Sequence, residues 1–184
     1  MQNLELLLSC GALRSSCPYH SWKESDHMRK HFIPPTPPTV RRQVENWLDL
    51  ESVATVEVTS EDEGFPVQSA LVPGEPQGWR AAIPGTQTIR LVFDQPQHLT
   101  RISLAFEEQE ITRTQEFVLR WSSDSGRSFR EILRQQWNFS PPQTAREFEE
   151  YEVELSDITV LELIITPDIS GGMARASVKS LRVC

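Results

Sequence analysis

The sequence predicts an all-β domain folded as a β-sandwich, and three observations support this prediction. Segment 113–137 has the pattern of a β-hairpin, because two runs of β-prone residues flank a turn that contains Asp124 and Gly126. The first run carries alternate apolar residues, as on a strand with one core face: Phe117, Leu119 and Trp121. Similar alternation recurs along the chain in short runs separated by turn residues, which is typical of a sandwich.

A tail and one short helix are expected before the sheets. Residues 1–39 lack a periodic apolar face and end in the proline-rich run 33–38, which predicts a flexible tail with a stiff spacer. A single domain should follow over residues 40–184. Its first element should be a short amphipathic helix from Thr39 to Leu50, where four apolar residues follow helical spacing: Val40, Val44, Trp47 and Leu48.

The remainder of the chain divides into short strands. They are expected at Val53–Val58, Pro66–Leu71, Gln87–Phe93, Leu99–Phe106, Thr114–Ser122, Phe129–Trp137, Glu149–Leu155, Val160–Thr166 and Ala176–Val183. Ten residues on these strands should be buried between two antiparallel sheets: Ile89, Leu91, Phe93, Ile102, Leu104, Leu119, Trp121, Val153, Leu163 and Ile165.

Loop lengths indicate where a binding surface should lie. If successive strands run up and down, the short connections 94–98, 123–128 and 156–159 share one end of the sandwich. The opposite end then carries the longer connections 72–86, 107–113, 138–148 and 167–175. Binding surfaces are commonly built from long loops on a rigid scaffold, so this end is the expected site.

Composition excludes several classes of function. The chain has 184 residues, a formal net charge of −8 and a pI of about 5.1, which argues against a general nucleic-acid binder. No apolar run reaches the length of a transmembrane helix, so no membrane association is expected. Cys10, Cys17 and Cys184 make an odd count, which favours free thiols in a reducing compartment and predicts a cytoplasmic location.

The order of motifs in this chain matches a known pattern. Gly78-Trp79 lies in the first long loop, the strand Gln87–Phe93 follows it, and the hairpin carries Ser122-x-Asp124-x-Gly126-x-x-Phe129. From about residue 53 to 184 the chain resembles discoidin-type domains, which are galactose-binding-like jelly rolls. It departs from them at Trp121 and Phe129, where they have tyrosine and tryptophan, and in one extra residue between Asp124 and Gly126. The resemblance implies a jelly-roll β-sandwich that binds carbohydrates, although members of this superfamily also bind proteins, lipids and nucleic acids.

One acidic segment and one tryptophan each have two competing interpretations. The run Ser60–Gly64 offers carboxylate oxygens near the position of the family's calcium loop, so it is either a calcium site or an exposed acidic turn. Trp79 in the long loop 72–86 either exposes a ring that stacks on a sugar or plugs the end of the sandwich, as its counterparts often do. The sequence offers ligands for no cofactor other than this calcium ion, and carbohydrate binding is expected without one.

Five residues are the candidates for ligand binding, because they combine a ring for stacking with side chains that bond hydroxyl groups: Trp79, Arg80, Arg113, Asn138 and Arg175. Arg113 could instead pair with Glu110 on the surface. No nucleophile elbow, phosphate-binding glycine loop or zinc-binding motif is present in the sequence. The sequence therefore predicts a non-catalytic binding module for a glycan; the alternative is a protein–protein interaction module that uses the same loops.

Overall fold

The computed structural model describes residues 46–184, and the predictions for residues 1–45 lie outside this range. The elements in chain order are α1 (Leu50–Val53), β1 (Ala54–Val58), α2 (Gln68–Leu71), β2 (Trp79–Pro84), β3 (Gln87–Glu107), β4 (Arg113–Ser122), β5 (Arg130–Phe139), β6 (Arg146–Thr166), β7 (Arg175–Val178) and β8 (Ser180–Val183). Among the described residues, no helix has the length and apolar character needed to cross a membrane.

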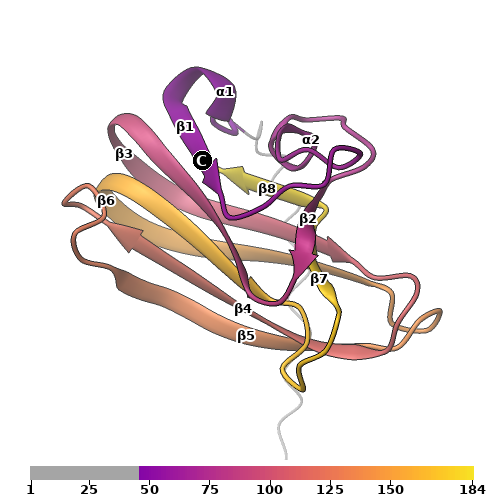
Figure 1. Cartoon of the computed structure of the whole chain (residues 1–184). Helices are drawn as coiled ribbons and strands as arrows, with labels where there is room; N and C mark the ends of the chain where they lie inside the picture. The colour runs from indigo at the N-terminus through magenta and orange to yellow at the C-terminus, as the bar shows by residue number, and fades with distance from the viewer. Residues whose placement is uncertain (1–45) are drawn as a thin grey trace, which may run out of the picture. The chain divides into compact units, whose positions relative to one another are not determined.

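The two longest strands build both layers of the sandwich. β3 and β6 have 21 residues each and pair antiparallel along most of their length, with register shifts between Val92 and Arg101 of β3. Both ribbons fold back near these shifts, at the left of Figure 1. One half of β3 lies in a layer with β1, and its other half lies in a layer with β8. β4 and β5 extend the first layer beyond β6.

The predicted alternation places the core between these layers. Eight of the ten residues expected to be buried are buried, and they form one apolar cluster with residues from both halves of β3. Each such side chain stabilises the fold by about 1.5–3 kcal/mol relative to an exposed position. The other two, Trp121 and Val153, are half-buried and pack against the edge of this cluster. The prediction of full burial is wrong for these two, because both lie at the margin of a layer.

One predicted strand is a helix. The segment Pro66–Leu71 contains α2 instead of a strand, with Ala70 and Leu71 buried beside Val67. These three residues have the i, i+3, i+4 spacing of one face of a helical turn, and the Val72 N–H donates to the Gln68 carbonyl to close that turn. Conversely, β2 lies inside 72–86, which the sequence predicts to be a loop.

Two further elements differ from the prediction: the first helix begins later than expected, and the last strand is divided in two. In the described part of the expected helix 39–50, residues 46–49 are not helical and α1 begins only at Leu50. The backbone N–H of Leu48 bonds instead to the carbonyl of Val183, at 2.8 Å, so contact with β8 replaces helical pairing. The predicted strand Ala176–Val183 is divided at Lys179, which separates β7 from β8.

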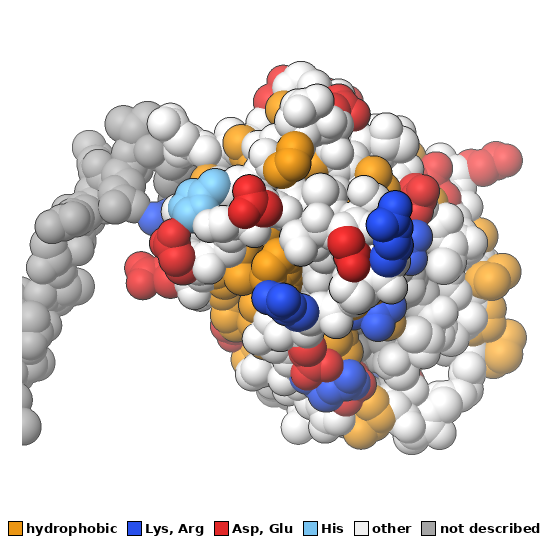
Figure 2. Space-filling view, turned by 90° about the vertical axis from the view of Figure 1, so that its left-hand side faces the viewer, with side chains coloured by type: hydrophobic (Ala, Val, Ile, Leu, Met, Phe, Trp, Pro, Cys, Tyr) orange, Lys and Arg blue, Asp and Glu red, His pale blue; other side chains and the backbone are white. Residues whose placement is uncertain are grey.

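The predicted short connections 94–98 and 156–159 are not loops, because they lie inside β3 and β6 at the register shifts of these strands. Hydrogen bonds nevertheless group the short connections apart from the long loops. At the short-loop end, Ser125 N donates to Thr159 Oγ1 at 2.9 Å, which joins two of the short connections. Figure 2 views this end, where acidic and basic side chains are interspersed on the surface. At the long-loop end, Glu108 N donates to Ala145 O at 2.8 Å, and Ile169 N donates to Thr114 O at 2.9 Å.

Candidate functional site

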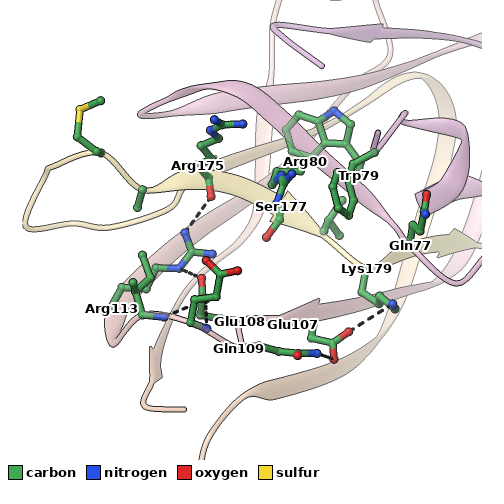
Figure 3. A pocket seen from close by; sticks show the side chains of 16 residues that line it. Gln77, Trp79, Arg80, Glu107, Glu108, Gln109, Arg113, Arg175, Ser177 and Lys179 are labelled. Carbon is green, nitrogen blue, oxygen red and sulfur yellow. Dashed lines mark hydrogen bonds and ion pairs between the residues drawn. The ribbon is translucent and has the colours of Figure 1, made fainter. Parts of the chain in front are cut away.

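A pocket of about 560 Å³ lies at the long-loop end, between the β2–β7 ladder and the loop 108–112 (Figure 3). Arg80, Arg175 and Ser177 lie on one side of it, and Arg113, Glu108 and Gln109 on the other. Its full lining is Phe65, Gln77, Trp79, Arg80, Glu107, Glu108, Gln109, Glu110, Ile111, Arg113, Met173, Ala174, Arg175, Ser177, Val178 and Lys179.

The two-stranded sheet of β2 and β7 turns one face toward the core and the other toward the pocket. Trp79 pairs with Val178 and Arg80 with Ser177 in antiparallel register. Trp79 and Val178 are buried in the core, whereas Arg80 and Ser177 are partly exposed on the opposite face. The strict two-residue alternation of a strand therefore delivers polar side chains to the pocket and apolar ones to the core.

Gly78 permits this ladder to form. Its φ is +75°, and a Cβ at this position would lie 2.6 Å from the carbonyl oxygen of Val178. A larger residue would have to push β7 away from the start of β2. The chain can thus enter β2 in close contact with β7 only because this residue has no side chain.

Two arginines on the ladder side share one carboxylate. Arg80 Nη2 lies 3.2 Å from Asp62 Oδ2, and Arg175 Nη1 lies 2.9 Å from the same oxygen. The other oxygen of Asp62 accepts the Gly64 N–H at 3.0 Å. This backbone hydrogen bond and the two arginines hold the pKa of Asp62 below its usual value, against the opposing effect of burial. Asp62 therefore stays ionised and draws Arg80 and Arg175 together.

Arg80 is also held by an aromatic ring. Its guanidinium carbon lies 3.9 Å from the centre of the Phe65 ring, which is a cation–π contact. Together with the bond to Asp62, this contact fixes the plane of the guanidinium group. A fixed guanidinium loses little conformational entropy when it binds a ligand.

Arg113 is a buried charge on the opposite side of the pocket. Its side chain is 2% exposed, its Nε lies 2.9 Å from Glu108 Oε2, and its Nη1 donates to Arg175 O at 2.9 Å. Burial lowers the pKa of Arg113, while the charges of Glu108 and Asp168 act in the opposite direction. Arg113 thus ties β4 to β7 and to the loop 108–112.

Glu108 is the residue that the sequence analysis missed on this side. Its Oε1 accepts the N–H groups of Glu110 and Ile111, at 2.8 and 3.1 Å, while its Oε2 pairs with Arg113. The alternative in which Arg113 pairs with Glu110 on the surface is therefore wrong, because its partner is Glu108. In many turns a carboxylate accepts hydrogen bonds from the backbone N–H groups two and three residues further along the chain. An acidic residue at this position of a predicted turn is the signal that could have identified Glu108.

The structure brings four of the five predicted site residues to one pocket. Arg80, Arg113, Arg175 and Trp79 all line it. Trp79, however, is 1% exposed and belongs to the core, so the expectation of an exposed stacking ring is wrong and the plugging role is observed. Asn138 lies outside the pocket lining, and its Oδ1 accepts a hydrogen bond from Thr114 Oγ1 at 2.7 Å on the β4–β5 surface.

The acidic run Ser60–Gly64 uses its oxygens within the protein. Glu61 Oε2 accepts the N–H of Val67 at 2.6 Å, and both oxygens of Asp62 are bonded as described above. Within residues 46–184, no group of three or more His, Cys, Asp or Glu residues is arranged to hold a metal ion.

Comparison with known proteins identifies the fold. No family model and no curated protein sequence matches this chain. Among solved structures it is similar to a family 32 carbohydrate-binding module of Clostridium perfringens in complex with GalNAc-β-1,3-galactose, with 19% identity over 74% of this chain and 98% of that one and a TM-score of 0.55. A family 32 module of C. perfringens NanJ, in complex with galactose, has 14% identity over 72% and 94% of the two chains and a TM-score of 0.54.

A third similar structure is a module from a family 31 glycoside hydrolase of C. perfringens, with 16% identity over 74% and 93% of the two chains and a TM-score of 0.55. All three are modules of the discoidin, or galactose-binding-like, type. The chain therefore has the galactose-binding-like jelly-roll β-sandwich fold that its sequence resembles.

Proposed function

We propose that the chain is a non-catalytic carbohydrate-binding module whose ligand occupies the pocket between the β2–β7 ladder and the loop 108–112. The observation that carries this proposal is the set of polar side chains held around one cavity by contacts within the protein. Arg80 and Arg175 are fixed by Asp62, and Arg113 by Glu108. Three of the residues predicted from sequence thus contribute donors or position them.

The chemistry of the pocket suits a sugar. A volume of about 560 Å³ is within the range of small-ligand sites, roughly 300–1,000 Å³. Guanidinium groups donate to hydroxyl oxygens, and the carboxylates and amides of the loop 108–112 accept from hydroxyl groups. Ile111 and Met173 expose apolar surface at the edge, against which the C–H face of a sugar ring can pack. The carbohydrate-binding modules of similar fold support this assignment.

A glycan array followed by isothermal titration calorimetry tests the proposal. The first titrant is GalNAc-β-1,3-galactose, because a module of similar fold was solved with it. Arg175→Ala should weaken binding of any glycan found by about tenfold or more, because a hydrogen bond to a charged group contributes roughly 1.5–3 kcal/mol. Arg127→Ala is the matched control, since this arginine is exposed in the turn at the opposite end.

Equal affinities of the wild type and Arg175→Ala would contradict the proposed site, and an array without any bound glycan would contradict the proposed function. The second candidate is a protein-interaction module. It is favoured by the exposed apolar side chains of the described residues, which all lie toward the long-loop end: Ile83, Ile111, Phe148, Ile169 and Met173. Replacing Phe148 and Ile169 together by Ser should abolish binding of a protein partner and leave glycan binding nearly unchanged, because neither residue lines the pocket.

A further inference from the structure

The ladder side of the pocket carries more positive than negative charge. We infer, on the basis of the proposed function, that the preferred ligand is an acidic saccharide whose carboxylate binds Arg80 and Arg175. These two arginines have only one carboxylate, Asp62, between them, and a single oxygen of it serves both. One positive charge therefore remains unmatched at this corner.

The other cations of the pocket are matched. Arg113 pairs with Glu108 at 2.9 Å and also experiences the charge of Asp168. Lys179 pairs with Glu107 at 3.3 Å. Glu107 also pairs with Arg146, but the side chain of Arg146 is 79% exposed and lies outside the pocket lining, so solvent screens its charge. The positive excess is thus concentrated at Arg80 and Arg175, on a chain whose formal net charge is −8. Within the pocket of this acidic molecule, an anionic group is therefore least disfavoured at this corner.

The arginine pair has donors left for a ligand. Arg80 uses Nη2 for Asp62, and Arg175 uses Nη1. The described residues supply no acceptor to the second Nη group of either arginine. The side chain of Arg80 is 39% exposed and that of Arg175 is 45% exposed, so both can be reached by a ligand. Because Asp62 and Phe65 already hold Arg80 in place, a ligand carboxylate would meet a prearranged pair of donors.

The opposite side of the pocket presents more acceptors than donors, because the side chain of Arg113 is buried there. Glu107, Glu108 and Gln109 lie there, and Glu110 makes no side-chain ion pair with any described residue. These groups would repel a second negative charge but accept hydrogen bonds from hydroxyl groups. The two sides therefore suit a sugar that has one carboxylate at one edge and hydroxyl groups at the other.

Two monosaccharides that differ only at C6 test the inference. The methyl α-glycosides of galacturonate and galactose have the same ring stereochemistry, but the first carries a single carboxylate where the second carries a hydroxymethyl group. The protein should bind the galacturonate glycoside about tenfold more tightly or better in 20 mM salt, and the advantage should shrink as salt is raised. Calorimetric titration of the whole chain measures both affinities.

Variants assign the preference to the arginine pair. Arg80→Gln and Arg175→Gln should each reduce the ratio of the two affinities toward one, and Arg127→Gln at the opposite end should leave it unchanged. Thermal melting of each variant shows that it is folded. A ratio near one in the wild type, or a ratio that survives both pocket substitutions, would overturn the inference. Binding of neutral glycans with no response to the galacturonate glycoside would overturn it as well but leave the proposed function standing; a blank glycan array would remove both.

Discussion

Arg90 and Glu162 lie directly opposite each other in the register of β3 and β6, and Arg90 donates from Nη2 and Nε to Glu162 Oε2 at 2.7 and 2.9 Å. Arg120, the register partner of Glu162 on β4, bonds the other oxygen. The Phe129 ring lies under both guanidinium groups, 4.5 Å from that of Arg120. As a result, Glu162 is 1% exposed although it points away from the core.

Replacing Glu162 by Gln should lower the free energy of unfolding by about 1.5–3 kcal/mol, because two partly exposed arginines would lose the charged hydrogen-bond acceptor between them. Urea unfolding measures this loss. Glu57→Gln is the matched control: it also removes a partner of Arg90, but Glu57 is exposed, so its loss should cost about 1 kcal/mol or less. Similar losses for both variants would mean that burial of Glu162 has no energetic consequence.

Gly78→Ala should destabilise the protein more than Gly74→Ala. Both glycines have positive φ, +75° and +89°, so either substitution carries a backbone penalty of roughly 1–2 kcal/mol. Only at Gly78 would the added Cβ also meet the backbone of β7, whereas nothing lies within 4 Å at Gly74. The difference between the two melting temperatures therefore measures the contact of β2 with β7. Glycan affinity should fall only for Gly78→Ala, since this ladder forms one side of the pocket.

Asp124 should make stability depend on pH in the acid range. Hydrogen bonds from the hydroxyls of Ser122 and Ser128 and from the Ser128 N–H lower the pKa of Asp124 far below its usual value. A lowered pKa in the folded state stabilises the protein above the unfolded-state pKa, about 3.9, and this contribution is lost as the pH falls through the folded-state pKa. Asp124→Asn should therefore reduce the melting temperature at pH 7 and have progressively less effect below pH 4.

Asp94→Asn serves as the control for this pH dependence. Asp94 is exposed at the same end and makes no side-chain hydrogen bond with the described residues, so its replacement should change the melting temperature little at either pH. Glycan binding by Asp124→Asn should equal that of the wild type at pH 7, because the turn and the pocket lie at opposite ends. A specific loss of binding would show that the site has been assigned to the wrong end.

Arg182 should fix α2 to the domain. Its guanidinium donates to the carbonyls of Ala70 and Val72, at 3.0 and 2.8 Å, and burial lowers its pKa. Arg182→Met keeps the aliphatic stem but leaves these carbonyls unpaired, which should cost about 1–3 kcal/mol in urea unfolding. Limited proteolysis should then cut first near residues 66–78. Unchanged protection of this segment would mean that apolar packing of Ala70 and Leu71 alone holds α2.

The sequence by itself determined the strands and the hairpin turn, because their signals are local. Alternation along β3, β4 and β6 reflects the side-chain period of two in any strand, so it is visible without knowledge of the partners. The same holds for the hairpin turn, because the hydrogen bonds of the Asp124 side chain reach residues no more than four positions away. Loop lengths then sufficed to assign the long loops to one end.

Tertiary structure alone decided the short elements and the details of the pocket. α2 and β2 are too short for periodicity to distinguish helix, strand and loop, and their state follows from packing against β8 and β7. Whether Trp79 is buried or exposed depends on the face that β2 turns to the core. The pairing of Arg175 with Asp62 joins residues 113 positions apart, and no local pattern encodes such a contact. It forms because the folded sheets bring two distant loops together, and the charge excess of the pocket is a consequence of that proximity.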